Sequence, residues 1–420
     1  MFERTILPAG PRVITARTPA ARSLSVAAYV RAGSRIESPQ IAGVAHFMEH
    51  VTFKGTRAYP TTRLLSQAIE GIGGSCNAAT DRESTVYWAR LPVREAARGF
   101  EVLGELVTRP LLRDGDIERE RGIIVDEIRS YRDDPAQYVF NVFDQAFFGD
   151  GPLGREIAGD EETVLRMPVT ALREFWAASY QPANTIVAAA GDISHATAVE
   201  LTAAAFGSGN GEVAGFSPAP SVPQRRVTVV RRPGAQAHLC VGVPALARDH
   251  PDQWVLELLN TILGDGSSSR LFQKVREEAA LAYDVHSFTS DYADCGTLQV
   301  YAGVDPGDLP AALAAVLTEL ARLRDRRVPE AELARARAYA GGRLELRLEE
   351  GRHLCSWLGV QEALHARVLS LEDALAGLAA VTPADIQRLA DELFRDDRLC
   401  LAVITPGGGT RRLEQALRLT

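Results

Sequence analysis

Two histidines and a glutamate near residue 50 have the types and spacing of a zinc site. They belong to the segment His46-Phe47-Met48-Glu49-His50, which reads H-x-x-E-H. On a helix, His46 and His50 lie one turn apart on the same face, so both imidazoles can hold one Zn²⁺. Glu49 is placed to accept a proton from a water molecule at the metal rather than to act as a ligand. The segment therefore predicts hydrolytic zinc chemistry.

A catalytic zinc site also needs a third protein ligand and an open position for water. Glu127 can supply this ligand from a separate helix, which we predict over residues 116–131 because its isoleucines recur at helical spacing. Glu120 lies two turns earlier on the same face and could hydrogen-bond a ligating histidine as an outer-shell group. From these residues alone, a zinc site and a chance match are both open. A purely structural metal site is a further alternative, although it would usually include cysteine.

The 420 residues divide into two similar halves. A stretch rich in Gly, Ser and Pro predicts a linker over residues 207–224, between domains 1–206 and 225–420. The first half has strands at 24–30 and 84–91 and helices at 94–108 and 116–131, and the second has strands at 237–243 and 296–304 and helices at 253–263, 309–323 and 332–348. We therefore predict an α+β fold of two homologous domains, each a mixed or antiparallel β-sheet packed with helices and related by internal duplication.

The duplication is chemically asymmetric. Where the first half has its histidines, the second half has residues 256–263, which contain no histidine. Arg343 lies near the position equivalent to Glu127. Only the first half is therefore expected to bind metal, with one zinc ion per chain.

Composition excludes several functional classes. Hydrophobic residues make up 46% and charged residues 24%, as in a soluble globular protein, and the net charge of −8 comes without the basic stripe of a nucleic-acid-binding protein. The five cysteines are odd in number and far apart, so we expect no disulfide framework. No run of 18 apolar residues predicts a membrane span, and no leader is apparent, so we expect a cytoplasmic protein.

Together these motifs resemble the pitrilysin (M16) family of zinc peptidases, in the branch of the mitochondrial processing peptidase and its bacterial relatives. In that family a glutamate follows the second histidine of H-x-x-E-H by 77 positions, which is Glu127 here, and an earlier glutamate matches Glu120. The segments at 43–50, 53–56, 152–155 and 180–184 also match, so the resemblance covers nearly the whole chain. It implies a metalloendopeptidase in which His46, His50 and Glu127 bind zinc and Glu49 is the base.

The resemblance also implies substrate contacts in both halves. Residues 73–80 resemble an edge strand beside the zinc helix, where Asn77 would contact the peptide backbone and Ala78 would leave room for it. Without the resemblance, this segment indicates a glycine-rich turn that enters a strand. Arg276 would hold a substrate carbonyl or the C-terminal part of the peptide, and Tyr283 would donate to the developing oxyanion. By themselves, these two side chains would be interpreted as surface and core residues.

Relatives of this kind enclose a chamber with four homologous domains, of which this chain supplies two. We therefore expect a homodimer that hydrolyses peptides or unfolded segments, and we expect neither nucleic acid nor membrane as a partner. A heterodimer with a metal-free homologue stays open. So does a non-catalytic or heterodimer-dependent subunit of a processing-peptidase-like complex, although such chains typically lose zinc ligands or the base.

Overall fold

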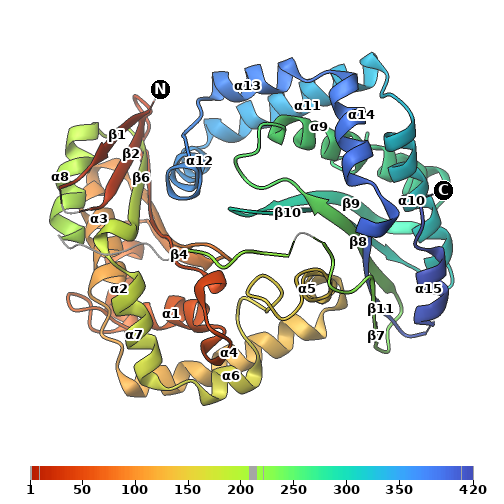
Figure 1. The fold of residues 1–420 in the computed structure, drawn as a ribbon. Helices are drawn as coiled ribbons and strands as arrows, with labels where there is room; N and C mark the ends of the chain where they lie inside the picture. The colour runs from red at the N-terminus through yellow and green to blue at the C-terminus, as the bar shows by residue number, and fades with distance from the viewer. Residues whose placement is uncertain (1, 9, 208–214, 221, 408, 420) are drawn as a thin grey trace. The chain divides into compact units, whose positions relative to one another are not determined.

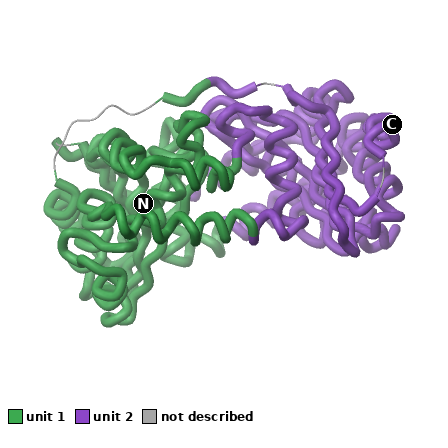
Figure 2. Tube along the Cα trace, turned by 90° about the horizontal axis from the view of Figure 1, so that it is seen from below, with its two compact units in different colours: residues 1–129, 156–217, 345–370 green, residues 130–155, 218–344, 371–420 purple. Residues whose placement is uncertain are grey.

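The computed structural model describes residues 2–8, 10–207, 215–220, 222–407 and 409–419. The predicted linker therefore lies partly outside the described residues, at 208–214 and 221. The chain forms two compact units, drawn in green and purple in Figure 2. Unit 1 comprises Met1–Arg129, Glu156–Ser217 and Glu345–Ser370, and unit 2 comprises Ser130–Arg155, Pro218–Leu344 and Leu371–Thr420.

A mixed sheet forms the centre of unit 1. Its strand order is β1-β2-β6-β3-β5-β4, in which β2 and β6 are parallel and the other neighbours are antiparallel. The strands are β1 (Glu3–Ile6), β2 (Arg12–Arg17), β3 (Ser23–Val30), β4 (Ser75–Thr80), β5 (Thr85–Pro92) and β6 (Thr185–Gly191). Only the first residue of β3 is not buried, because helices cover both faces of this inner strand.

The sheet of unit 2 repeats this arrangement. Its order is β7-β11-β8-β10-β9, again with one parallel pair, between β7 and β11. The strands are β7 (Val227–Arg231), β8 (Ala237–Ala245), β9 (Ala282–Asp291), β10 (Gly296–Val304) and β11 (Cys400–Thr405). The order matches β2-β6-β3-β5-β4 strand for strand, so the predicted α+β fold with two duplicated mixed sheets is confirmed. Strand β1 is an addition to unit 1.

The helices follow the same repeated order (Figure 1). In unit 1 they are α1 (Val44–Thr52), α2 (Thr62–Glu70), α3 (Ala96–Thr108), α6 (Glu161–Arg166), α7 (Val169–Ser179), α8 (His195–Phe206) and α12 (Gly351–Leu364). In unit 2 they are α5 (Pro135–Phe148), α9 (Gln253–Leu263), α10 (Leu309–Asp325), α13 (Leu371–Ala380), α14 (Pro383–Leu393) and α15 (Thr410–Ala416). Helices α4 (Asp114–Asp133) and α11 (Glu330–Glu349) each have residues in both units.

Several shorter helical segments complete the chain. Five are 3₁₀ helices: η1 (Ser34–Ile36), η2 (Pro39–Ile41), η3 (Val93–Glu95), η4 (Pro182–Asn184) and η6 (Asp396–Arg398). The segment η5 (Phe272–Glu278) is a π-helix. The helices and strands predicted from the sequence all correspond to observed elements, with boundaries shifted by a few residues. Within the described residues, no helix is both long enough and apolar enough to cross a bilayer.

Each unit includes one helix from the opposite half of the sequence. Helix α12 packs on β2, β3 and β6 of unit 1, where Leu358 and Cys355 join a buried cluster with Tyr29. On the same helix, the Glu362 carboxylate forms ion pairs with Arg4 and Arg12, at 2.7 and 3.2 Å. Helix α5 packs in turn on β8 and β11 of unit 2. The compact units thus differ from the contiguous halves 1–206 and 225–420: unit 1 includes α12 of the second half, and unit 2 includes α5 of the first half.

The other face of the unit 1 sheet bears the second core, which positions the zinc motif. Alternate residues of β3, such as Val26 and Ala28, join Phe100 and Leu103 of α3 in this cluster. Helix α1 contributes Phe47 and its buried neighbours to the same cluster, and α4 contributes Ile117, Ile124 and Ile128. The two helices that carry the predicted ligands are therefore anchored in one hydrophobic core.

Candidate metal centre and active site

Backbone geometry and hydrogen bonds fix the N-terminus of α1, the helix that carries the zinc motif. Gly43 precedes it with a φ of 93°, and a Cβ there would lie 2.4 Å from the carbonyl oxygen of Ala158, so the position requires glycine. The buried Glu37 carboxylate accepts hydrogen bonds from the backbone N–H groups of Gly43 and Ala45, at 2.7 and 2.8 Å. These contacts satisfy amide groups that the helix itself leaves without partners.

One face of α1 is buried and the other carries the chemistry. Val44, Ala45, Phe47, Met48 and Val51 lie in the core. The helical period therefore leaves the polar residues of the motif, His46, Glu49 and His50, together on the half-buried face. The side chains of His46 and His50 lie next to one another, with ring centroids 4.6 Å apart.

Helix α4 brings the third predicted ligand to these rings. The Glu127 carboxylate oxygens lie 3.7 Å from His46 Nε2 and 3.3 Å from His50 Nε2. The donor atoms of the three residues all lie within 4.8 Å of one another, the one such metal-ligating group among the described residues. Two imidazole nitrogens and one carboxylate oxygen are the donor set of a catalytic zinc site, so these residues fit the ion. The Glu127 side chain is 51% exposed, which leaves the position accessible to water.

The protonation of two of the three donors, His46 and Glu127, suits a cation. Burial, followed by the neighbouring charge of His50, lowers the pKa of His46 to about 4, so this ring is neutral and can donate a lone pair. A hydrogen bond from His50 lowers the pKa of Glu127, so the carboxylate is ionised. The buried Nδ1 of His46 has no hydrogen-bond partner among the described residues.

Glu120 orients the second histidine. Its carboxylate accepts a hydrogen bond from His50 Nδ1 at 3.0 Å and pairs with Lys54 Nζ at 2.6 Å. Because Nδ1 donates to Glu120, Nε2 is the nitrogen directed to the metal position. Burial opposes the charged form of His50, but its hydrogen bonds to Glu120 and Glu127 outweigh burial and raise its pKa to about 9. Burial also opposes ionisation of Glu120, yet the hydrogen bonds from His50 and Lys54 hold its pKa below the ordinary value.

Glu49 lies beside the ligands without joining them. Thr80 Oγ1, at the end of β4, donates to Glu49 Oε2 at 2.5 Å. Burial raises the pKa of Glu49, and the Thr80 hydrogen bond offsets part of this rise. A carboxylate whose pKa moves toward neutrality is well matched to accept and release a proton at physiological pH.

Strand β4 forms the edge of the unit 1 sheet next to α1. It pairs with β5 on one side and is the last strand in the sheet order. Its exposure alternates, so Asn77 is exposed while Ala78 and Thr80 are half-buried on the face toward the core. The Asn77 side chain accepts a hydrogen bond from the Ala78 N–H at 2.8 Å. An edge strand of this kind can take up an extended peptide as an added strand.

The structure also brings Arg276 and Tyr283 together, within unit 2. Arg276 lies on the π-helix η5, and its guanidinium carbon is 5.6 Å from the centre of the Tyr283 ring and 4.8 Å from that of Phe272. Tyr283 lies on the edge strand β9 and is 78% exposed. Its phenol is therefore open to solvent, and the substrate roles of Arg276 and Tyr283 stay predictions.

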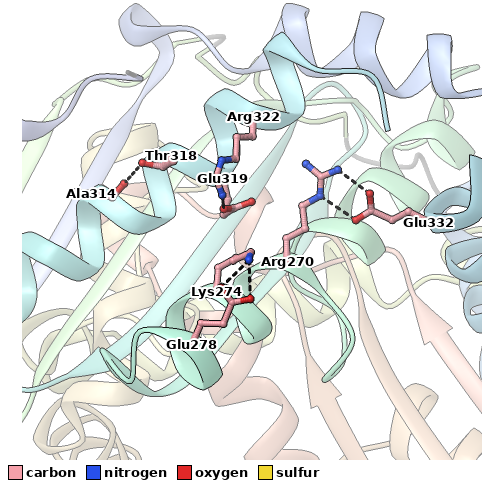
Figure 3. Close-up of polar contacts among 8 residues, drawn as sticks. All are labelled: Arg270, Lys274, Glu278, Ala314, Thr318, Glu319, Arg322 and Glu332. Atoms are coloured by element: carbon pink, nitrogen blue, oxygen red, sulfur yellow. Dashed lines mark hydrogen bonds and ion pairs between the residues drawn. The ribbon is translucent and has the colours of Figure 1, made fainter. Parts of the chain in front are cut away.

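Ion pairs hold the segment that carries Arg276. Arg270 forms two hydrogen bonds with the Glu332 carboxylate of α11, at 2.9 and 2.7 Å, and Lys274 pairs with Glu278 one turn later (Figure 3). Elsewhere on α11, Arg343 pairs with Asp265 at 2.9 Å. At the position equivalent to Glu127, the second half therefore has an arginine in an ordinary ion pair.

Comparisons with known proteins show the family of the chain. Residues 12–161 match the family described as "Insulinase (Peptidase family M16)", and residues 166–339 match "Peptidase M16 inactive domain". A Streptomyces coelicolor protein named "Uncharacterized zinc protease" is 36% identical over 96% of this chain and 89% of its own length. The chain belongs to peptidase family M16. The family predicted from the sequence is therefore confirmed.

Solved structures show the same fold. A protease from Helicobacter pylori superposes with a TM-score of 0.91 at 22% identity, covering 97% of this M16 chain and all of that one. A chain of the structure described as "Complex III2 from Candida albicans, Inz-5 bound" gives a TM-score of 0.86 at 20% identity, covering 99% of both chains. At these identities the similarity establishes the M16 fold alone.

Two partners in the M16 site were not identified from the sequence. In the sequence, Lys54 is only part of the matching segment 53–56, and Thr80 is only the last residue of the segment 73–80. Neither residue type signals an ion pair with Glu120 or a hydrogen bond to Glu49. Both contacts depend on how β4 and α4 pack on α1.

The Glu120 contact generates a prediction for metal affinity. Replacing Glu120 with Gln removes the charge that orients His50, so we expect zinc affinity to fall by about 10- to 100-fold. Competition with a chromogenic chelator measures this loss. Asp126→Asn is the matched control, because this carboxylate lies on the same helix but is exposed and pairs only loosely with Arg129, at 3.5 Å. Equal zinc affinity in the two variants would contradict the role assigned to Glu120.

Proposed function

We propose that this M16 chain is a zinc-dependent endopeptidase that hydrolyses peptides and unfolded protein segments. The observation that carries the proposal is the convergence of His46, His50 and Glu127 on one position, with Glu49 beside it. The four residues come from two helices anchored in one core. His46 is neutral and Glu127 is ionised, as ligands must be, and His50 would release its proton when zinc binds.

The proposed mechanism assigns one task to each side chain. Zinc, when bound, supplies a Lewis acid that polarises the scissile carbonyl and lowers the pKa of water. His46, His50 and Glu127 hold the ion, and Glu120 keeps the His50 ring in its ligating orientation. Glu49 accepts the proton of the attacking water and then delivers it to the leaving amine nitrogen. No side chain becomes covalently attached to the substrate.

Strand β4 is the proposed binding edge for the peptide. A strand added there forms hydrogen bonds through its main chain, so binding requires an extended segment and depends little on sequence. Asn77 would contact the peptide backbone near the scissile bond, and the small Ala78 would leave room for it. Peptides and unfolded chains offer an extended segment more readily than the ordered core of a folded protein does, and this supports them as substrates.

We further propose that two copies of the chain form a homodimer. The resemblance to enzymes with four-domain chambers supports this assembly, as does the presence of both the zinc motif and the Arg276–Tyr283 pair in one chain. In the proposed dimer, Arg276 and Tyr283 of one copy bind substrate at the zinc site of the other. Tyr283 would donate to the oxyanion in the transition state.

The catalytic assignment predicts a selective loss in Glu49→Gln. The substitution keeps the shape of the side chain but removes the base, so we expect zinc to stay bound while kcat falls by about 10²- to 10⁴-fold. Hydrolysis of an extended fluorogenic peptide, with zinc content measured on the same sample, provides the test. Full activity in a zinc-loaded Glu49→Gln protein would exclude Glu49 as the base.

The dimer proposal predicts recovery of activity on mixing two inactive variants. Glu49→Gln and Tyr283→Phe proteins should each hydrolyse peptide slowly, and exchange of subunits should restore activity. The reason is that one site of each mixed dimer then combines an intact Glu49 with an intact Tyr283. Verified mixed dimers without recovery would contradict a site shared between copies. A wild-type chain that becomes active only with a second, different chain would instead support the heterodimer.

A further inference from the structure

The hydroxyl of Thr80 links the proposed peptide-binding strand to the proposed base. Thr80 is the last residue of β4, and its Oγ1 lies 2.5 Å from Glu49 Oε2. An ionised carboxylate only accepts hydrogen bonds, so the hydroxyl donates its single proton to this oxygen. Hydrogen bonds to a charged acceptor are shorter and stronger than those between neutral groups. The contact therefore restricts the rotation of the Glu49 carboxylate.

The end of β4 is firmly held, so Thr80 can act as a fixed reference point. In the turn that follows, the Asp81 N–H donates to Ser84 O at 2.8 Å, and the Ser34 N–H donates to Asp81 O at 3.1 Å. Thr85, directly opposite Thr80 in β5, is fully buried, and its hydroxyl donates to Ala32 O at 2.8 Å. A side chain on such a support keeps its partner within a narrow range of positions.

Glu49 is held at its backbone as well. Its carbonyl oxygen accepts a hydrogen bond from Thr52 Oγ1 at 2.8 Å, within α1. The backbone of Glu49 is therefore fixed by the helix, and its carboxylate by a residue of the neighbouring strand.

We propose that Thr80 is a positioning residue, which aligns Glu49 relative to a peptide bound on the same strand. The inference rests on the proposed function and deepens it. The edge of strand β4 would bind the substrate, and its last side chain, Thr80, would orient the carboxylate of the base, Glu49. One rigid element then fixes both reactants, and a misplacement of about 1 Å is enough to cost about 10²-fold in rate.

A purely structural role for Thr80 leads to a different expectation. If the hydroxyl only satisfied a half-buried carboxylate, its removal would lower stability and leave turnover per folded molecule unchanged. The positioning role instead affects kcat, with little change in KM or in zinc content, because neither the edge of β4 nor the metal ligands are altered.

The test compares Thr80→Val with Thr80→Ser in the full-length, zinc-loaded protein. Valine keeps the shape and removes the donor, so kcat should fall by about 10- to 100-fold while KM and bound zinc stay close to wild type. Serine restores the hydroxyl and should restore most of kcat. Thr318→Val on α10 is the matched control: its hydroxyl donates to Ala314 O within a helix, and its loss should leave kcat unchanged (Figure 3).

Two results would overturn the inference: wild-type kcat in Thr80→Val, or a kcat in Thr80→Ser as low as in Thr80→Val. A high-resolution crystal structure of Thr80→Val gives a readout that does not depend on activity, because the Glu49 carboxylate should then occupy more than one orientation. An unchanged single orientation counts against the proposal. If Glu49→Gln is inactive but Thr80→Val is fully active, the inference fails and the proposed function stands. If the wild type shows no zinc-dependent hydrolysis, the proposed function itself fails.

Discussion

The concentration of negative charge around α1 is the constraint on which the candidate site depends. Glu49, Glu120 and Glu127 face the same two histidines from two helices. Carboxylates brought together in a half-buried site tend to become protonated unless neighbouring cations and hydrogen-bond donors stabilise their ionised forms. Lys54 meets Glu120, and His50 donates to both Glu120 and Glu127. The position between the donor atoms is one that a divalent cation would complete, because its charge favours the ionised forms.

Unit 2 shows that the fold itself does not require this charge arrangement. Its sheet has the same strand order, and α9 and α11 correspond to α1 and α4. There, however, Arg343 and Asp265 neutralise one another directly. The duplicated frame is thus stabilised by its apolar cores in both units, and the carboxylates of unit 1 are an addition to that frame. A feature that the frame does not need has its explanation in chemistry, which supports the proposed zinc site.

The zinc motif was predictable because its residues are close together in the sequence. The duplication was predictable because the order of strands and helices repeats along the chain. His46, Glu49 and His50 lie within one helical turn, and Glu127 lies on a helix with a regular apolar face. The exchange of α5 and α12 was not predictable, since an amphipathic helix shows that it has a buried face but not which sheet covers it. The extra strand β1 also lacked a counterpart that would have revealed it.

The partners of the site residues were equally beyond the sequence. Lys54 and Thr80 are common residue types, and their contacts with Glu120 and Glu49 arise only when β4 and α4 pack against α1. Residue spacing fixes neighbours along one helix, whereas contacts between elements depend on the register of the sheet and on helix packing. Resemblance to a family indicates which residues matter, whereas packing between elements determines how each is held.

A zinc titration of the metal-stripped chain tests the central claim most directly. Peptide hydrolysis is followed as zinc is added back, in the wild type and in Glu127→Ala. The account predicts that activity is lost on chelation, rises in proportion to zinc and reaches its plateau at one ion per chain, whereas Glu127→Ala neither retains the ion nor recovers activity. Hydrolysis that persists without metal, or full recovery in Glu127→Ala, would contradict it.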